Sequence, residues 1–140
     1  MVEFPDGIRV HGRGLARPRP DGPEPDFGLY LGTSRLRRKH GGGLTWPHEW
    51  VNWPDFLLPT DPAAARRQIR ALHERAKTET VEVACYGGAG RTGTVMACLA
   101  TLSGVPAEDA VAWVREHYHE RAVETPWQRR WVKTFAGRLD

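Results

Sequence analysis

The stretch that most constrains the fold of this chain runs from residue 81 to residue 93 and reads VEVACYGGAGRTG. The run at residues 80–83, rich in β-branched side chains, predicts a short strand that leads into Cys85 and a loop with glycine at positions 87, 88 and 90. A helical pattern opens directly afterwards, at Thr92. Because glycine adopts backbone conformations that other residues avoid, the segment predicts a strand, a tight loop and the beginning of a helix.

A loop of this kind is suited to binding an anion. Its backbone N–H groups can turn inward, and the first turn of the following helix adds unpaired donors and the positive end of its dipole. Arg91, six residues after Cys85, can pair with two phosphate oxygens at once through its planar guanidinium. We therefore predict a phosphate loop at residues 85–91. The residues expected to contact the phosphate beside Arg91 are Tyr86, Gly87, Gly88, Ala89 and Gly90.

The same surroundings favour the thiolate form of Cys85, which would then be a nucleophile aimed at phosphorus. The hydroxyl of Thr92 is placed to stabilise the sulfur as it attacks and again as it leaves. The Cys-x5-Arg spacing alone is a weak signal, because such strings also occur by chance. A second motif supports it thirty positions upstream of the cysteine, where Trp53, Pro54 and Asp55 follow one another.

The string C-Y-G-G-A-G-R-T resembles the Cys-x5-Arg-Ser/Thr loop of the protein tyrosine phosphatase superfamily, and W-P-D resembles the general-acid loop of that family. The resemblance implies that Cys85 attacks phosphorus, Arg91 holds the phosphate and Asp55 protonates the leaving group. A third match, V-E-T-P-W-Q, resembles the loop whose glutamine positions the hydrolytic water, which gives that role to Gln128. The chain departs from the family at Ala84, where a histidine usually helps to orient the loop.

Some of these residues also have a structural interpretation. Thr125-x-x-Gln128 is a capping box, a role that is compatible with positioning water. Without its neighbours, Asp55 would be interpreted as a structural carboxylate in a loop. The preceding Trp53 and Pro54 favour a catalytic role instead. The rival acid, Asp61, precedes Pro62 and is interpreted as a helix N-cap.

Hydrophobic periodicity predicts an α/β fold for the rest of the chain. Strands are expected at Gly7–Val10, Phe27–Leu31 and Glu49–Trp53, the first two separated by a loop at His11–Pro25. Helices are expected at Pro62–Lys77, Thr92–Leu102, Ala107–Tyr118 and from Thr125 onward. A strand, a crossover helix and a strand form the unit of a mainly parallel sheet, so we expect such a sheet with helices on both faces.

The length of 140 residues predicts one phosphatase domain, with N-terminal strands and a basic loop at 1–45 and a catalytic core at 46–140. The six tryptophans are interpreted as core residues. No apolar run is long enough for a membrane span, and the two cysteines do not suggest a disulfide scaffold. His117 and His119 lack metal-ligand spacing. We expect a cytoplasmic monomer with no membrane partner, no metal and no other cofactor.

The net charge of +3 arises in the first forty residues, which hold eight Arg and Lys against five Asp and Glu. Its densest run is Arg35, Arg37, Arg38 and Lys39. A solvated loop is the simplest interpretation of this run, and attraction of phosphorylated substrates is the alternative. No aromatic residues interleave it, so we do not expect a nucleic-acid partner.

The combined prediction is a cysteine-dependent phosphatase that hydrolyses phosphotyrosine in protein substrates through a phosphocysteine intermediate, with phosphoserine and phosphothreonine left open. Two alternatives also stay open. One is a phospho-binding module that has lost turnover, for which Ala84 is the support. The other is a phosphatase for phosphoinositides or RNA 5′-phosphates, although no Lys or Arg lies between Cys85 and Arg91 to read such charged groups.

Overall fold

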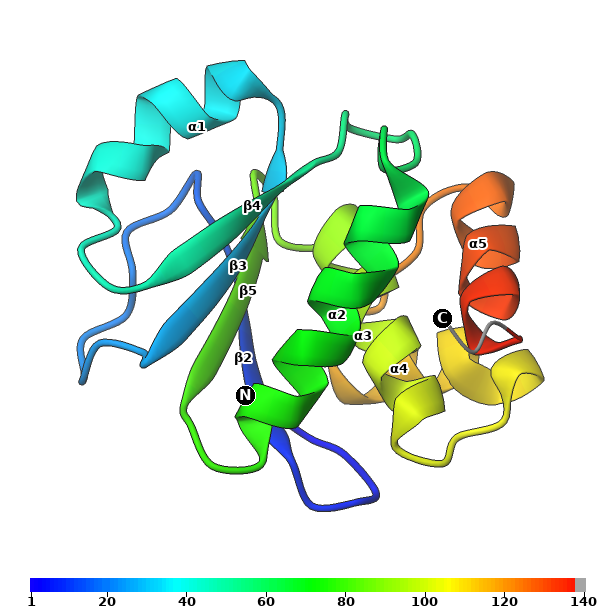
Figure 1. Cartoon of the computed structure of the whole chain (residues 1–140). Coiled ribbons are helices and arrows are strands. Elements are labelled where there is room, and N and C mark those ends of the chain that lie inside the picture. The colour runs from blue at the N-terminus through cyan, green and yellow to red at the C-terminus, as the bar shows by residue number, and fades with distance from the viewer. Residues whose placement is uncertain (138–140) are drawn as a thin grey trace.

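A five-stranded sheet forms the centre of the molecule, in the strand order β1-β2-β5-β3-β4 (Figure 1). The structure is a computed structural model that describes residues 1–137. Residues 138–140, which the predicted catalytic core includes, lie outside this range. The strands are β1 (Val2–Glu3), β2 (Arg9–Gly14), β3 (Phe27–Gly32), β4 (His48–Asn52) and β5 (Val81–Cys85). β1 pairs antiparallel with β2 and the other neighbours pair in parallel, so the predicted mainly parallel sheet is confirmed.

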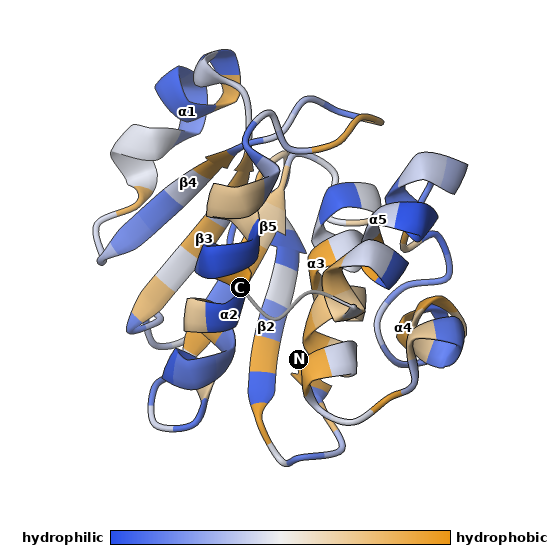
Figure 2. Ribbon diagram, turned by 45° about the vertical axis from the view of Figure 1, so that its right-hand side comes forward, coloured by the Kyte–Doolittle hydropathy of each residue, from blue (hydrophilic) through white to orange (hydrophobic). Residues whose placement is uncertain are grey.

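Four of the helices pack on one face of the sheet. The helices are α1 (Ser34–His40), α2 (Pro62–Ala76), α3 (Gly90–Leu102), α4 (Ala110–His117) and α5 (Pro126–Ala136), with short 3-10 turns at Gly41–Gly43 and Ala107–Asp109. The main core contains side chains of α2 to α5 together with Leu29, Leu31, Val81 and Val83 of the sheet. Figure 2 shows α3 as mostly hydrophobic, in agreement with its position at the centre of this core.

A smaller core lies on the opposite face, because successive residues of a strand point to opposite sides. It contains Tyr30 and Ala84, which alternate with the residues of the main core, and Leu36 of α1 packs against it. The hydroxyl of Tyr30 donates a hydrogen bond to the buried Glu82 at 2.7 Å. The α/β class with helices on both faces is thus confirmed, with α1 as the helix that contributes to the smaller core.

Two boundaries of the N-terminal half differ from the sequence-based expectation. The loop predicted from His11 is wrong, because β2 continues to Gly14 through a parallel register with β5 that pairs Gly14 with Cys85. The basic run at residues 35–39 is not a loop either, since it forms α1, a helix without buried residues. β2 is longer than expected because its backbone pairs with β5 as far as Gly14. The run at residues 35–39 is helical because it contains residues of high helix propensity.

Three predictions in the C-terminal half also need correction. α3 begins at Gly90 instead of Thr92, so Arg91 lies in its first turn. The helix predicted from Ala107 is divided into a 3-10 turn and α4. Trp127 is not a core residue, because 45% of its surface is exposed.

In contrast, Asp61 caps α2 as predicted, by accepting the N–H of Ala64 at 3.1 Å. Within residues 1–137, no helix combines the length and apolar character that a membrane span needs.

Candidate active site

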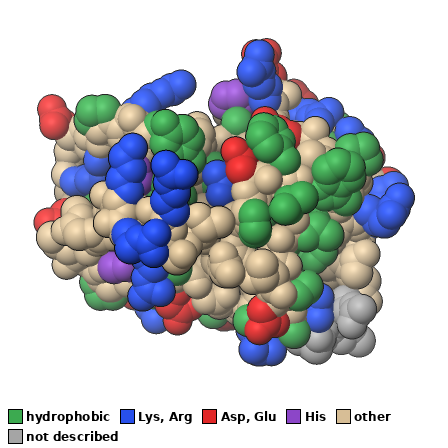
Figure 3. All heavy atoms as spheres, turned by 90° about the horizontal axis from the view of Figure 1, so that it is seen from above, with side chains coloured by type: hydrophobic (Ala, Val, Ile, Leu, Met, Phe, Trp, Pro, Cys, Tyr) green, Lys and Arg blue, Asp and Glu red, His purple; other side chains and the backbone are tan. Residues whose placement is uncertain are grey.

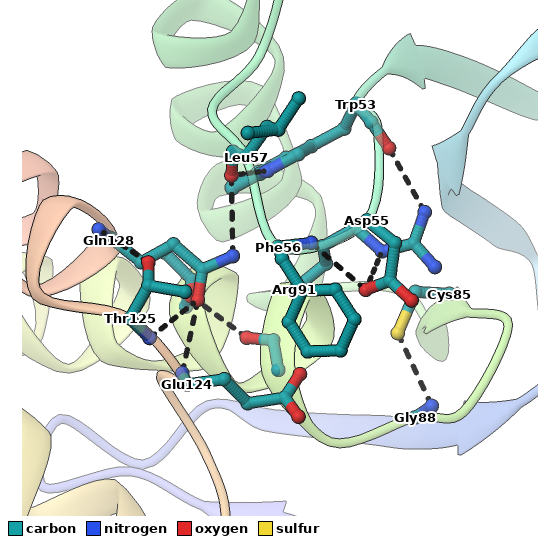
Figure 4. A network of polar contacts seen from close by, with 12 residues as sticks. Trp53, Asp55, Phe56, Leu57, Cys85, Gly88, Arg91, Glu124, Thr125 and Gln128 are labelled. Carbon is teal, nitrogen blue, oxygen red and sulfur yellow. Dashed lines mark hydrogen bonds and ion pairs between the residues drawn. The ribbon is translucent and has the colours of Figure 1, made fainter.

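The phosphate loop lies where the central strand β5 ends and α3 begins. Cys85 is the last residue of β5 and is buried, and the N–H of Gly88 donates to its Sγ at 3.2 Å (Figure 4). Gly88 has φ of +83°, a left-handed conformation that favours glycine. The strand end, the left-handed residue and the helix start therefore turn a backbone donor toward the sulfur.

The chain after β2 anchors the first half of this loop. The N–H of Leu15 donates to the carbonyl of Cys85 at 2.8 Å, and the N–H of Ala16 donates to the carbonyl of Tyr86 at 3.0 Å. Both carbonyl groups are therefore paired with the chain after β2, which leaves the amide groups of the loop available to an anion. This anchor depends on the C-terminal part of β2 that the sequence analysis assigned to a loop.

Tyr118 anchors the second half of the loop. Its hydroxyl donates a hydrogen bond to the carbonyl oxygen of Gly88. Burial, and then the neighbouring Cys85, raise the pKa of Tyr118, so the phenol stays protonated as a donor. The usual histidine of the family is replaced here by Ala84, and Tyr118 supplies an alternative side-chain support for the loop. The sequence analysis missed this role, because Tyr118 is distant in sequence from Gly88.

Arg91 joins the phosphate loop to the predicted acid loop at residues 53–57. The arginine is 4% exposed, and its Nη1 donates to the carbonyl of Trp53 at 2.9 Å. Its Nε lies 3.5 Å from Oδ1 of Asp55, an ion pair in which half of the Asp55 side chain stays exposed. The sequence-predicted nucleophile, arginine and acid are therefore brought to one site.

These residues surround a pocket of about 120 Å³. Its lining contains the predicted residues Asp55, Cys85, Tyr86, Gly87, Ala89, Gly90 and Arg91, together with Phe56 and Glu124. A small pocket that is lined by a thiol, by the backbone of a glycine loop and by a guanidinium can hold one phosphate group. Among residues 1–137 we find no cluster of three His, Cys, Asp or Glu side chains suited to a metal ion.

The acid loop is held by the beginning of α5. The indole nitrogen of Trp127 donates to the carbonyl of Phe56 at 2.6 Å, and Nε2 of Gln128 donates to the carbonyl of Leu57 at 3.2 Å. The indole of Trp53 donates to the same Leu57 carbonyl at 2.8 Å (Figure 4). Phe56 has φ of +62°, a strained conformation for a residue with a side chain, as is often seen where a site constrains the backbone.

Comparison with known families agrees with this geometry. The model of the protein-tyrosine phosphatases matches residues 31–123, about two thirds of the chain. The chain belongs to the protein-tyrosine phosphatase family. The matched segment includes Asp55, Cys85, Arg91 and Thr92, and it ends before Glu124 and Gln128. The family assignment supports a phosphatase of the tyrosine or dual-specificity type.

Individual relatives and solved structures of other proteins are also similar to this chain. An uncharacterized protein of Methanocaldococcus jannaschii, MJ0215, is 47% identical over 86 residues, which cover 61% of this chain and 53% of that protein. The chain thus spans about half the length of this relative. Tk-PTP in its active form has a TM-score of 0.74 at 24% identity, covering 99% of this chain and 97% of its own. PTPMT1 in complex with PI(5)P has a TM-score of 0.63 at 18% identity, covering 79% and 76%.

Two predicted catalytic residues do not line the pocket in the structure. Thr92 is fully buried, and its hydroxyl has no hydrogen-bond partner among residues 1–137, so it makes no bond to the sulfur of Cys85. Gln128 is also fully buried, and the predicted capping box with Thr125 is confirmed. The carbonyl of its side chain accepts the N–H of Glu124 at 3.0 Å, and its amide binds the acid loop.

Phe56 and Glu124 are the pocket residues that the sequence analysis did not identify, and Glu124 is the ionisable one of the two. It lines the pocket, and a Cβ added to Gly90 would lie 1.7 Å from its Oε1, so the carboxylate rests directly against the backbone of the phosphate loop. Burial, followed by the negative charge of Asp55, raises the pKa of Glu124. The sequence did contain one indication of this residue. Glu124 lies within V-E-T-P-W-Q, four residues before Gln128, which was the residue predicted to be catalytic.

Proposed function

We propose that this protein hydrolyses phosphotyrosine in protein substrates through a phosphocysteine intermediate. The observation that supports the proposal is the convergence of Cys85, Arg91 and Asp55 on one small pocket. Each of the three supplies a different requirement of the reaction, namely a nucleophile, a phosphate clamp and a general acid. A thiol nucleophile must stay reduced, which is our reason for proposing a cytoplasmic location.

In the first step, the sulfur of Cys85 attacks phosphorus in line with the departing oxygen. The sulfur–phosphorus bond forms as the bond to the phenolic oxygen breaks, and the carboxylic acid of Asp55 gives its proton to that oxygen. The loop amides and the guanidinium of Arg91 hold the three remaining phosphoryl oxygens. The ion pair between Arg91 and Asp55 supports this role, because it holds the carboxyl group beside the guanidinium that would bind the phosphate.

In the second step, water attacks the phosphocysteine. The new phosphorus–oxygen bond forms as the sulfur–phosphorus bond breaks, and the electron pair returns to sulfur. Asp55, now a carboxylate, takes a proton from the water and is thereby reset for the next cycle. The N–H of Gly88, 3.2 Å from the sulfur, stabilises the departing thiolate.

Aromatic side chains beside the pocket favour an aryl phosphate. Phe56 and Tyr86 both line the pocket and are 52% and 48% exposed, so each offers a ring face to an incoming group. Seen from above, hydrophobic side chains gather on one side of this face of the molecule (Figure 3). The ring of phosphotyrosine can pack between such side chains, whereas phosphoserine has no ring to do so.

Basic residues on α1 support a second candidate, a phosphatase for a more highly charged phosphate ester. Lys and Arg side chains gather on the side of the same face where α1 lies (Figure 3). PTPMT1, which shares the fold, was solved with PI(5)P. The phosphate loop of this chain has no basic residue before Arg91, which favours the protein substrate. A phospho-binding module without turnover is the third candidate, because Ala84 replaces the usual histidine.

One panel of substrates separates these candidates. Phosphotyrosine, phosphoserine and phosphothreonine peptides, phosphoinositides and RNA 5′-phosphates would be assayed for phosphate release beside the Cys85→Ser variant. We expect the phosphotyrosine peptide to have the highest kcat/KM, with no release by the variant. Preference for phosphoinositide or RNA would replace the proposal by the second candidate. Binding of vanadate without release from p-nitrophenyl phosphate would identify the non-catalytic module.

A further inference from the structure

We propose that Glu124, instead of Gln128, holds the water that hydrolyses the phosphocysteine. This inference rests on the proposed function and assigns a second carboxylate to the same site. The carboxylate of Glu124 accepts a hydrogen bond from one O–H of the water, while Asp55 receives the other proton as the water attacks phosphorus.

The position of Glu124 fits this role. It lines the pocket together with Cys85, Arg91 and Asp55. Figure 4 shows its side chain pointing from the segment before α5 toward the phosphate loop, beside the ring of Phe56. The carboxylate therefore lies within the pocket that a phosphorylated Cys85 would occupy.

The carboxylate lies against the phosphate loop, and the backbone that carries it is held by Gln128. Gly90 leaves the space that its Oε1 fills, since an added Cβ there would lie 1.7 Å from that oxygen. The backbone N–H of Glu124 donates to Oε1 of Gln128 at 3.0 Å. A carboxylate that is carried by a held backbone beside the phosphate loop can align a water molecule for attack on phosphorus. Gln128 thus acts on Glu124 as a positioning residue.

The side chain of Gln128 itself is not free to hold the water. It is fully buried, and its carbonyl oxygen accepts the N–H groups of Glu124 and Thr125 at 3.0 and 3.3 Å. Its amide nitrogen donates to the carbonyl of Leu57 at 3.2 Å. Moving this side chain toward the pocket would break the capping box and the contact with the acid loop.

The two carboxylates of the pocket have different tasks because their surroundings differ. Asp55 forms the ion pair with Arg91, beside the guanidinium that would bind the phosphate, and we assign it to the leaving oxygen. Glu124 lies against Gly90, on the phosphate loop. The burial that raises the pKa of Glu124 does not remove its function, since either protonation state has an oxygen that accepts a hydrogen bond.

Rapid-mixing kinetics with p-nitrophenyl phosphate test the proposal, because nitrophenolate release reports the first step and steady-state turnover reports the second. In Glu124→Ala we expect an unchanged burst rate followed by steady-state turnover about 10- to 100-fold slower than that of the wild type, the size of one lost hydrogen bond to a charged group. Acid quenching and mass spectrometry should show accumulated phosphocysteine in this variant. Glu124→Gln, whose amide keeps an acceptor oxygen, should retain most of the steady-state rate.

Glu116→Gln is the matched control, since Glu116 is an exposed carboxylate on α4, and it should behave as the wild type. The proposal is overturned if Glu124→Ala loses burst rate and steady-state rate equally, if neither changes, or if Glu124→Gln is as slow as Glu124→Ala. These outcomes are distinct from a failure of the proposed function, in which the wild type itself would release no nitrophenolate or Cys85→Ser would remain active.

Discussion

Nη1 of Arg91 donates a hydrogen bond to the backbone carbonyl of Trp53 over 2.9 Å. This bond joins the first turn of α3 to the residue that follows β4, two segments separated by 38 positions in the sequence. The arginine that we predict to bind the phosphate therefore also holds the beginning of the acid loop. Both predicted functions, binding of the phosphate and positioning of the acid loop, therefore depend on the guanidinium of Arg91.

Replacing Arg91 by lysine should weaken both phosphate binding and turnover. Lysine keeps the charge but loses the planar fork, which pairs two oxygens and here also reaches the carbonyl of Trp53. We expect inhibition by vanadate to weaken about 10- to 100-fold, as for the loss of one charge-assisted hydrogen bond. Inhibition constants and kcat measure the two effects. Arg35→Lys on α1 is the control, and equal behaviour of the two variants would contradict the role of Arg91.

Replacing Asp55 by asparagine should remove protonation of the leaving group. We expect kcat to fall about 100- to 10,000-fold for phenyl phosphates with poor leaving groups, and least for those with the best leaving groups. A series of aryl phosphates of graded leaving-group pKa measures this slope. Asp61→Asn is the control, because asparagine also caps helices and Asp61 caps α2. A uniform loss across the series would argue against an acid at position 55.

Replacing Cys85 by serine should abolish turnover and preserve binding. A hydroxyl in this pocket is a far weaker nucleophile than a thiolate, while the amides and Arg91 that hold the phosphate are unchanged. Calorimetric titration with a phosphotyrosine peptide should give a dissociation constant similar to that of the wild type measured with a non-hydrolysable analogue. Residual catalysis by the serine variant would show that sulfur is not the nucleophile.

Replacing Tyr118 by phenylalanine should loosen the phosphate loop. The carbonyl of Gly88 loses its donor, and an unsatisfied buried acceptor typically costs about 1–3 kcal/mol of unfolding free energy. Urea unfolding measures this loss, and kcat should fall together with it because the N–H of Gly88 contacts the sulfur. Stability and kcat that both stay at wild-type values would show that the bond does not support the loop.

The stability of the Glu124→Gln variant should depend on pH in a defined direction. Burial and then Asp55 raise the pKa of Glu124 in the folded protein, although Arg91, Arg121 and His119 act in the opposite direction. A raised carboxyl pKa favours the folded state while the group is protonated, and this contribution is lost as pH rises through the folded-state value. The variant should therefore gain stability relative to the wild type as the pH rises from the ordinary carboxyl pKa through the raised folded-state pKa of Glu124. Thermal unfolding across that range measures the difference, and a flat or falling difference would contradict it.

The part of the site that is local in sequence could be predicted from the sequence alone. Cys85 and Arg91 lie six residues apart across a strand end, a glycine loop and a helix start, so short-range backbone geometry is enough to bring them together. The capping box of Thr125 and Gln128 is equally local and was predicted for the same reason. Asp55 was predicted from a motif, and the structure pairs it with Arg91 at 3.5 Å.

The residues that sequence reasoning missed or misplaced depend on how α4 and α5 pack. Trp127 was assigned to the core together with the other tryptophans, yet its indole donates to the carbonyl of Phe56 and the residue is 45% exposed. Gln128 points into the interior, and Glu124 enters the pocket instead. Helical periodicity predicts which residues share a face, but not which neighbouring segment that face will meet.

The sequence by itself determined the α/β class and the pairing of nucleophile with arginine, because strand and helix patterns and a six-residue spacing are read within one short segment. The tertiary structure decided which carboxylates share the pocket and which side chains hold its loops. Those choices arise from contacts between segments far apart in the chain, such as Tyr118 with Gly88 and Glu124 with Gly90. Their energies come from burial and close packing, which exist only after the helices have assembled on the sheet.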